Sequence, residues 1–400
     1  MGDALCQTCE VAVNPPRGMR DILPGEKRTR EELLAQIRAL YTARGFQEIE
    51  TPGLEDLERL TSGQGGDNEK LVFKVQKRGD ELKRAIEEGG ELADLGLRFD
   101  LTVPLTRFYA TNRAKLPRVF KAIQIGNVWR AERPQKGRYR QFLQCDIDII
   151  GDESPLAELE LISASLAALD AIGLSSATIR LNDRRLLTQG LKAAGVTTNI
   201  EQAMITIDKL DKIGSSGVAE ELGEQLGEGV AKAVLRWLED SQSAELPELL
   251  AWAKDLGEYA SRVRFDPSLV RGMGYYTGAI FEIEYPSVDA SIGGGGRYDS
   301  MVGRWAGVDA PAVGISLGIE RIIDLVDQPQ KRAGSLVLLI EEDVAVALTK
   351  QQELIAQGLE VRLERKAKNL KAQLAELSEQ GYESFAFLVS GAELEIRPLD

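Results

Sequence analysis

The sequence predicts an α+β protein: a large sheet domain with a helical insertion, followed by a small α/β module. Three observations lead to this prediction. Strand patterns dominate residues 97–150 and return after residue 275. No clear strand occurs over about 184–263, which is mostly helical and charged, and strands alternate with helices beyond residue 334.

The composition restricts the chemistry that the chain can perform. Its 400 residues are 43% hydrophobic, which is enough for one large core and a smaller one. Histidine is absent, so the usual general base and the usual zinc ligand are missing, and a reaction must use arginine, carboxylate, tyrosine or backbone groups. Because the net charge is −14, a nucleic acid would have to contact local basic patches.

The chain is expected to be cytoplasmic and to have no association with a membrane. No apolar run approaches the length of a membrane span, and the N-terminus lacks the pattern of a secretory signal. Cysteine is scarce, as is typical of a reducing compartment. Cys6 and Cys9 could form half of a metal or redox site, but no second pair completes it, and the simpler interpretation is a disordered tail.

The N-terminal half contains one well-marked helix and several strands. The helix runs from about Arg28 to Arg44, with Leu33, Leu34, Ile37, Leu40 and Tyr41 at helical spacing, and Gly45 ends it. The further elements predicted before the insertion are strands at Phe46–Thr51, Leu97–Thr102, Phe120–Arg130 and Phe142–Ile150, and a helix at Pro155–Ile172.

Strand patterns resume after the insertion and lead into the C-terminal module. The first three elements are a strand at Tyr275–Tyr285, a glycine-rich segment at Ser291–Tyr298 and a strand-to-helix element at Ala312–Val326. In the module, Leu336–Ile340, Val344–Gln357, Glu360–Glu364, Asn369–Glu379 and Phe385–Val389 alternate strand and helix, which favours a mostly parallel sheet. The expected boundaries are a tail over 1–14, a core over 15–326, a linker over 327–334 and the module over 335–400.

The segment Phe142–Ile150 combines an apolar face with a polar face. Leu143, Cys145, Ile147 and Ile149 point one way, and Gln144, Asp146 and Asp148 point the other. A strand with its polar face in water is one interpretation. A site that places an amide and two carboxylates side by side is the other.

A dense cationic stretch comes just before this strand. It contains Arg130, Arg133, Lys136, Arg138 and Arg140, in a loop with proline and glycine. Two strands joined in this way predict a hairpin that binds a polyanion, because guanidinium groups match phosphate oxygens. Carboxylates beside it suit a cationic or hydrogen-bond-donating substrate.

Three further clusters carry polar or glycine-rich patterns. They are RGMGYYTG at 271–278, GGGGRYD at 293–299 and GISLGIER at 314–321. Four consecutive glycines let the backbone approach a ligand closely, although alone such a run is more often a flexible turn.

Taken together and in this order, these motifs resemble the histidyl-tRNA synthetases of the class II aminoacyl-tRNA synthetases. The segment PRGMRDILP at 16–24 is similar to the family's N-terminal entry, and the first helix, strand and Pro52 are similar to its dimer-forming motif 1. Residues 120–151 resemble motif 2, and GISLGIERI resembles motif 3. LVRGMGYYTG and GGGGRYD resemble the two signatures that separate the histidine enzymes from other class II members.

The resemblance implies a class II catalytic domain, with an antiparallel sheet flanked by helices and a helical insertion, and a C-terminal anticodon-binding-like domain. The implied activity is that of a histidine–tRNA ligase, which forms histidyl-adenylate and pyrophosphate from histidine and ATP and then charges tRNA(His). ATP would be a substrate accompanied by Mg²⁺, and the protein would be a homodimer.

The resemblance also assigns residues to histidine. Asp100 and Thr102 in LRFDLT match contacts to the α-ammonium group, with Gln144 beside them. Asp148 and Tyr276 would contact the two imidazole nitrogens. The complete implied histidine set is Asp100, Leu101, Thr102, Arg130, Gln144, Asp148, Arg271, Tyr275 and Tyr276.

The implied ATP site is mostly cationic. Arg130 would hold the α-phosphate and stabilise the transition state, and Arg271 would act on the same phosphate and the substrate carboxylate, replacing a metal used elsewhere in the class. Arg138 and Arg321 would bind the outer phosphates, and Phe142 and Arg321 would sandwich adenine. The complete implied ATP set is Arg130, Glu132, Arg138, Phe142 and Arg321, with Arg130 and Arg271 as the catalytic pair.

The chain departs from the family pattern at three places. Gly274 stands where the family commonly has aspartate, and Asp148 stands where many bacterial members have glutamate. The C-terminal domain is expected to be truncated, lacking a last helix.

Two rival functions share the same fold. One is the non-catalytic regulatory subunit of ATP phosphoribosyltransferase in histidine biosynthesis. The other is a paralogue that charges a small molecule or carrier protein. The retained arginines at 130, 138, 271 and 321 favour the ligase over the regulatory subunit.

Overall fold

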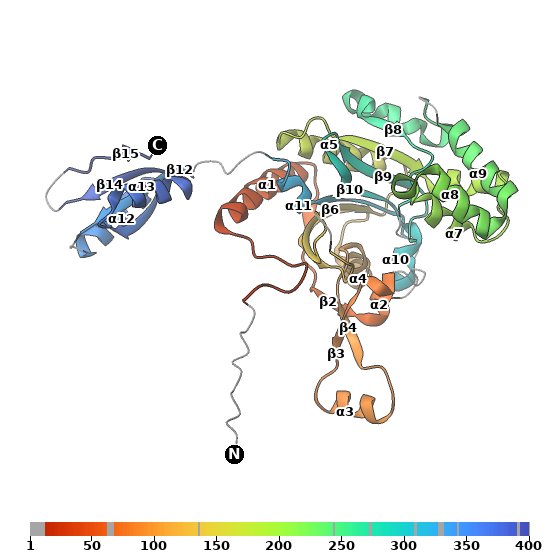
Figure 1. Cartoon of the computed structure of the whole chain (residues 1–400), viewed down its shortest axis with the longest axis horizontal. Helices are drawn as coiled ribbons and strands as arrows, with labels where there is room; N and C mark the ends of the chain where they lie inside the picture. The colour runs from red at the N-terminus through yellow and green to blue at the C-terminus, as the bar shows by residue number, and fades with distance from the viewer. Residues whose placement is uncertain are drawn as a thin grey trace, which may run out of the picture. The chain divides into compact units, whose positions relative to one another are not determined.

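The computed structural model describes residues 13–61, 68–134, 137–242, 245–271, 274–307, 310–326, 332–341, 344–389 and 393–399 (Figure 1). Cys6, Cys9, most of the predicted tail and residues 327–331 of the predicted linker lie outside these ranges. The chain divides into two compact units, with Leu34–Val326 in the larger one and Asp327–Asp400, together with Ile22–Leu33, in the smaller one.

An eight-stranded sheet forms the centre of the larger unit. Its strands are, in spatial order, β1 (Gln47–Glu48), β5 (Phe120–Trp129), β6 (Gln141–Ile150), β11 (Ala312–Gly318), β10 (Val288–Arg297), β9 (Ala279–Tyr285), β7 (Thr178–Asp183) and β8 (Val263–Phe265). The strands from β5 to β7 are antiparallel, and the parallel pairs β1–β5 and β7–β8 close the two edges. This arrangement confirms the predicted antiparallel sheet and the hairpin of β5 and β6.

Helices lie on both sides of the sheet, with α5 above it and α4 and α10 below it in the view of Figure 1. Those in this part of the chain are α1 (Pro24–Ala43), α4 (Thr102–Asn112), η2 (Arg113–Lys115), α5 (Leu156–Ala171), α10 (Asp299–Ala306) and α11 (Ile319–Ile323). The sequence of α5 is apolar around most of its circumference, which is typical of a buried helix, and α5 packs on β6 and β11. In α1, the side chains of Ile37 and Tyr41 are fully buried, as their helical spacing predicts.

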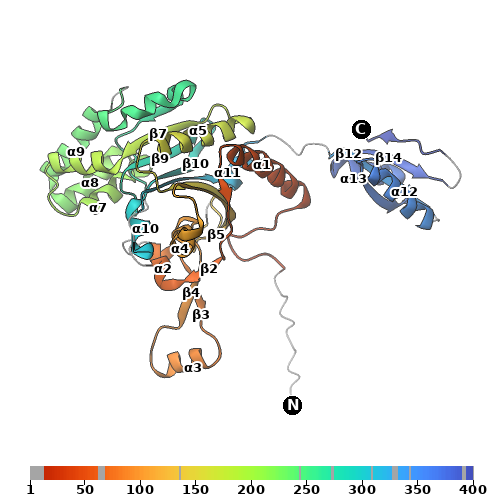
Figure 2. The same cartoon turned by 180° about the vertical axis from the view of Figure 1, so that it is seen from behind.

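A second antiparallel sheet and its helices form an arm that projects from the larger unit (Figures 1 and 2). Its elements are β2 (Leu54–Asp56), α2 (Leu57–Thr61), η1 (Asn68–Leu71), β3 (Phe73–Gln76), α3 (Gly79–Glu87) and β4 (Ala93–Leu97). The sequence patterns indicated none of these elements except for the end of β4.

The insertion between β7 and β8 is helical, as predicted. It comprises α6 (Arg184–Ala193), α7 (Ile200–Ile207), α8 (Leu210–Leu226), α9 (Glu228–Ser241) and η3 (Glu248–Arg262). The carboxylate of Asp183 caps α6 by accepting a hydrogen bond from the amide of Arg185 at 2.8 Å. Leu187, Met204 and Val218 are buried between these helices.

The smaller unit contains the predicted α/β module. Its elements are β12 (Arg332–Ile340), α12 (Val344–Ala356), β13 (Glu360–Arg365), α13 (Leu370–Glu379), β14 (Tyr382–Leu388) and β15 (Arg397–Pro398). Strands β13, β12 and β14 are parallel, and β15 adds an antiparallel edge strand that the sequence did not indicate. Strand β12 begins at Arg332, within the segment expected to be a linker.

One strand prediction was wrong, and one alternative is excluded. The strand expected at Leu97–Thr102 is absent, because β4 ends at Leu97 and α4 begins at Thr102. The carboxylate of Asp100 accepts a hydrogen bond from the amide of Val103 at 3.1 Å and so stabilises the first turn of α4. Gly293–Gly296 do not form a flexible turn but lie inside β10, paired with β9 and β11.

None of the helices in the described ranges is both long and apolar enough to cross a membrane.

Candidate functional site

A row of facing residues crosses the centre of the eight-stranded sheet. Asp146 on β6 faces Ser316 on β11, and Ser316 faces Gly294 on β10. Gly294 in turn faces Glu282 on β9, and Glu282 faces Arg180 on β7. Since facing residues in a sheet lie on the same side, this register places polar side chains from four strands on the same side as Gly294.

A small cavity of about 50 Å³ opens over this row. Most of the residues predicted to bind histidine line it, namely Asp100, Thr102, Arg130, Gln144, Asp148, Arg271, Tyr275 and Tyr276. The other lining residues are Asp146, Gly294, Gly295, Tyr298, Gly314, Ile315 and Ser316. The fold therefore brings together residues from six separate segments of the chain.

The cavity exists because glycine occupies two positions that face it. A Cβ atom on Gly314 would lie 1.9 Å from Oδ1 of Asp148, and one on Gly294 would lie 2.5 Å from Nη1 of Arg271. Both distances are far below van der Waals contact, so a side chain at either glycine would displace a functional group. The glycines thus provide close approach rather than flexibility.

The polar face of β6 is buried, which excludes the interpretation that this face lies in water. Gln144, Asp146 and Asp148 are all less than 9% exposed. Nε2 of Gln144 donates to Oγ of Ser316 at 2.7 Å, and the hydroxyl of Tyr298 donates to Oδ1 of Asp148 at 2.6 Å. Within the described ranges, Oε1 of Gln144, Oδ1 of Asp146 and Oδ2 of Asp148 are buried acceptors without a hydrogen-bond donor.

Burial changes the acidity of all three aspartates in the cavity. It raises the pKa of Asp148 to about 7 and that of Asp100 to about 6. Burial also raises the pKa of Asp146 well above its usual value, and the neighbouring charge of Asp148 raises it further. A ligand that brings positive charge or N–H donors would favour the ionised carboxylates.

Two arginines provide the opposite charge. Arg130 follows β5, and its Nε donates to the carbonyl oxygen of Phe99 at 3.0 Å. The guanidinium of Arg130 stacks over the Phe142 ring, 5.0 Å from its centroid. Arg271 has a φ of 61°, a left-handed conformation that is uncommon outside glycine, and its Nη1 donates to Oε2 of Glu282 at 3.1 Å.

The remaining residues predicted for ATP do not line this cavity. Arg138 and Glu132 are exposed in the loop between β5 and β6. The side chain of Arg321 on α11 donates to the carbonyl oxygens of Ser291 and Gly137. Burial, followed by the charges of Arg138 and Arg130, lowers the pKa of Arg321, so the arginines form a repulsive cluster that an anion would neutralise.

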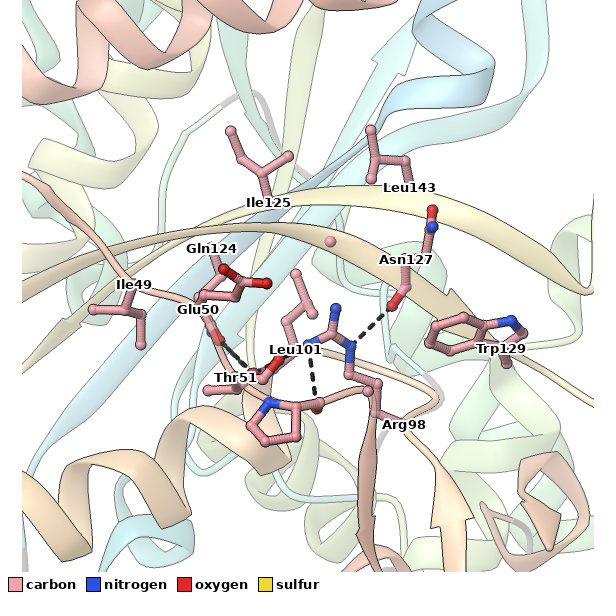
Figure 3. Close-up of a pocket in the computed structure, with 13 residues that line it drawn as sticks. Ile49, Glu50, Thr51, Arg98, Leu101, Gln124, Ile125, Asn127, Trp129 and Leu143 are labelled. Carbon is pink, nitrogen blue, oxygen red and sulfur yellow. Dashed lines mark hydrogen bonds between the residues drawn. The ribbon is translucent and has the colours of Figure 1, made fainter. Parts of the chain in front are cut away.

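Leu101 faces a second, larger cavity of about 410 Å³ (Figure 3). Arg98 fixes its wall, with Nη1 donating to the carbonyl oxygen of Thr51 at 2.7 Å and Nε donating to that of Asn127 at 2.9 Å. Trp129 and Leu143 line the same cavity. Leu101, which is also predicted to bind histidine, lines this second cavity rather than the smaller one.

Three polar side chains of the cavity were not assigned a role from the sequence. Asp146 stood in the predicted polar face of its strand, and Tyr298 and Ser316 stood in two of the quoted motifs. The alternation of apolar and polar residues along β6 was sufficient to place Asp146 on the same face as Gln144 and Asp148. Nothing local in the sequence pairs Tyr298 with Asp148, because they are 150 residues apart.

The chain was compared with known proteins. A family model described as histidyl-tRNA synthetase matches residues 18–322. The chain is 50% identical to the histidine–tRNA ligase of Leifsonia xyli subsp. xyli (strain CTCB07), over 97% of this chain and 98% of the relative. It is 40% identical to the probable histidine–tRNA ligase of Tropheryma whipplei (strain Twist), over 94% and 95% of the two chains.

Solved structures agree on the fold. The crystal structure of histidyl-tRNA synthetase from Nostoc sp. PCC 7120 superposes with a TM-score of 0.76 at 26% identity, covering 98% of this chain and 95% of that one. A structure from Bacillus halodurans C, described as an ATP phosphoribosyltransferase regulatory subunit/histidyl-tRNA synthetase, gives a TM-score of 0.74 at 23% identity, covering 96% of this chain and 100% of that one. The second match concerns the fold alone.

The raised pKa of Asp148 predicts how stability changes with pH. The folded protein retains a proton near pH 7 that the unfolded chain, with an ordinary pKa of 3.8, has released. The contribution to stability is therefore complete below about pH 4 and is lost as the pH rises through 7. The Asp148→Asn variant cannot titrate, so its free energy of unfolding should gain a few kcal/mol relative to wild type between pH 5 and 8, as about 1.4 kcal/mol corresponds to one pKa unit.

Urea unfolding at several pH values measures this difference. Asp80→Asn, at a side chain that is 89% exposed, is the control and should follow the wild-type profile. Parallel pH profiles for Asp148→Asn and wild type would contradict the prediction.

Proposed function

The chain belongs to the histidyl-tRNA synthetase family and acts as a histidine–tRNA ligase, and we propose that it forms histidyl-adenylate in the cavity lined by Asp148, Arg130 and Arg271. In this reaction a carboxylate oxygen of histidine bonds to the α-phosphorus of ATP. The bond from that phosphorus to the bridging oxygen breaks, and pyrophosphate leaves. The observation that carries the proposal is one cavity with buried carboxylates and two arginines, which suits a substrate with an ammonium group, a carboxylate and a phosphate.

Histidine recognition is proposed to use the acceptors of the cavity. Asp100, Thr102 and Gln144 would bind the α-ammonium group, and their common position in the cavity wall supports this role. Asp148 would accept from one imidazole N–H through Oδ2, an acceptor without a donor in the described ranges. The hydroxyl of Tyr276 would satisfy the other nitrogen, with Tyr275 packed against it at 4.8 Å between ring centroids.

The phosphates of ATP are proposed to contact arginines. Arg130 and Arg271 would stabilise the charge that develops on the α-phosphate, because both line the cavity. Arg138 and Arg321 would bind the outer phosphates, and the lowered pKa of Arg321 beside two other arginines supports an anion here. Phe142 would contact adenine, and Glu132 would lie near the nucleotide.

Mg²⁺ is proposed to arrive bound to ATP. Among the residues that the structure describes, no group of three or more cysteine or carboxylate side chains is arranged to hold a metal ion.

Removal of Arg271 tests the adenylation site. Arg271→Ala should lower kcat for histidine-dependent ATP–pyrophosphate exchange by about 10²–10³-fold, the usual effect of losing one preorganised donor to a developing charge. Arg236→Ala, at an exposed arginine of α9, is the matched control and should leave exchange unchanged. Near-normal kcat in Arg271→Ala would remove Arg271 from the reacting phosphate.

The adenylate is then proposed to charge tRNA(His). A ribose hydroxyl at the 3′ end of the tRNA attacks the histidyl carbonyl, and AMP leaves. The chain is acidic overall, so contacts to the tRNA phosphates need local positive charge. Arg133 in the loop after β5, the helical insertion and a basic cluster in the smaller unit are the proposed contacts.

The basic cluster consists of five exposed residues, Arg362, Arg365, Lys366, Lys368 and Lys371. Arg362 pairs with Glu364 at 2.9 Å and Lys366 pairs with Glu341 at 2.5 Å, so these two charges are partly neutralised. The other three are the more suitable phosphate contacts.

Neutralising those three charges tests the role of the cluster. The triple variant Arg365→Gln, Lys368→Gln, Lys371→Gln should raise the KM for tRNA at physiological salt and reduce the salt slope of binding by up to about 3. Pyrophosphate exchange should not change, and Lys350→Gln in the same module should behave as wild type. An unchanged salt slope would mean that the cluster is only a solvated face.

Gly274 is exposed, and a Cβ atom there would meet no atom within 4 Å. The aspartate that is common at this position in the family would therefore fit without displacing neighbouring atoms. Gly274→Asp should leave kcat/KM for histidine activation within about twofold of wild type, as for most surface substitutions. A clear gain in kcat/KM would show that the histidine site lacks a group that the aspartate supplies.

Two further assignments rest on the resemblance. The protein is proposed to be a homodimer, because its first helix, the following strand and Pro52 resemble the dimer-forming motif 1. A cytoplasmic location is proposed because the chain has only three cysteines.

A further inference from the structure

The catalytic arginine proposed above is held by a side chain that belongs to no motif of the site. Glu282 is the fourth residue of β9, and its carboxylate bridges two guanidinium groups. Its Oε2 accepts from Nη1 of Arg271 at 3.1 Å, and its Oε1 accepts from Nη1 of Arg180 at 3.3 Å.

The register of the sheet explains why this carboxylate reaches Arg271. Glu282 faces Gly294 on β10 and Arg180 on β7. The guanidinium of Arg271 occupies the space beside Gly294 that a side chain would otherwise fill. Arg271 therefore lies over the sheet directly beside Glu282, although its backbone is outside the strands.

Arg180 is itself fixed from several sides. Its side chain is 9% exposed, and its Nε donates to Oδ2 of Asp266 at 2.8 Å. It also pairs with Asp211, at the start of α8 in the insertion, at 3.0 Å. These partners hold Arg180 charged, and its pKa is raised above the usual value despite its burial. Arg180 can thus fix the position of Glu282.

Arg271 needs such a partner. Its left-handed backbone conformation is strained for a residue other than glycine. A long side chain on a strained loop can adopt many rotamers, whereas catalysis requires one guanidinium position. An anionic partner in a rigid central strand supplies that position.

We infer that Glu282 is a positioning residue that holds Arg271 over the cavity, and that Arg180 braces Glu282 from the opposite side. This inference rests on the proposed role of Arg271 in adenylation. Glu282 does not contact the substrate in this proposal and acts only through the arginine.

The neighbouring Glu284 provides a matched control. It lies two residues further along β9 and pairs with Arg180 at 3.5 Å and with Arg264 at 2.8 Å. No contact between Glu284 and Arg271 is present in the described ranges. Glu284→Gln therefore removes the same charge from the same strand without releasing Arg271.

The experiment compares the two glutamine variants by histidine-dependent ATP–pyrophosphate exchange with the full-length protein. Glu282→Gln should lower kcat by about 10–10²-fold. A displacement of about 1 Å in a catalytic group such as the guanidinium of Arg271 has effects of this size. The KM for histidine should change much less, and the Tm should match that of Glu284→Gln. Glu284→Gln should keep kcat within about twofold of wild type. Equal losses of kcat in the two variants would overturn the inference.

A double variant tests whether Glu282 acts through Arg271. In an Arg271→Ala background, Glu282→Gln should cause less than about a twofold further loss of kcat, because the group that it positions is gone. The same loss in both backgrounds would overturn the inference. If Arg271→Ala alone keeps near-normal kcat, the proposed role of Arg271 fails. If Arg271→Ala is impaired and Glu282→Gln is not, only the positioning role fails.

Discussion

Three aspartates buried in one small cavity determine what this protein can bind. Burial raises the pKa of Asp100, Asp146 and Asp148, so the fold alone does not favour their ionised forms. This opposes folding as the pH rises, because carboxylates without counter-charges are costly inside a protein. A ligand with an ammonium group and ring N–H donors compensates for that cost. In the proposed function, binding of histidine would offset this cost.

The two arginines of the cavity are held in position differently from the carboxylates. The carboxylates project from strand β6 and from Asp100, just before α4, whereas Arg130 and Arg271 come from segments outside the strands. Each arginine is therefore held by contacts with other elements: Arg130 by the carbonyl oxygen of Phe99 and the ring of Phe142, and Arg271 by Glu282. In the proposed adenylation site, the sheet would position the groups that bind the amino acid, and these further contacts would position the arginines that bind the phosphate.

The sequence predicted those features that depend on local periodicity. The alternation in Phe142–Ile150 identified the side of β6 that carries Gln144 and Asp148, because a strand has a period of two residues. It could not identify the hydroxyl of Tyr298 as a partner of Asp148, since Tyr298 follows β10 and that contact depends on the pairing of β10 with β11 and of β11 with β6. The error at Leu97–Thr102 has a related cause: buried apolar residues alternate there as in a strand, but the carboxylate of Asp100 starts a helix. Gly293–Gly296 could be placed in a strand only once their neighbours were known.

The glycines of β10 and β11 have a consequence for inhibitor design. Gly294, Gly295 and Gly314 present backbone to the cavity, and a side chain at any of them would overlap backbone or functional atoms. A compound that contacts this backbone surface would therefore meet positions at which resistance substitutions damage the enzyme itself. The exposed residues around the cavity, in contrast, tolerate many substitutions. A compound that depends on contacts with them would therefore be more open to resistance.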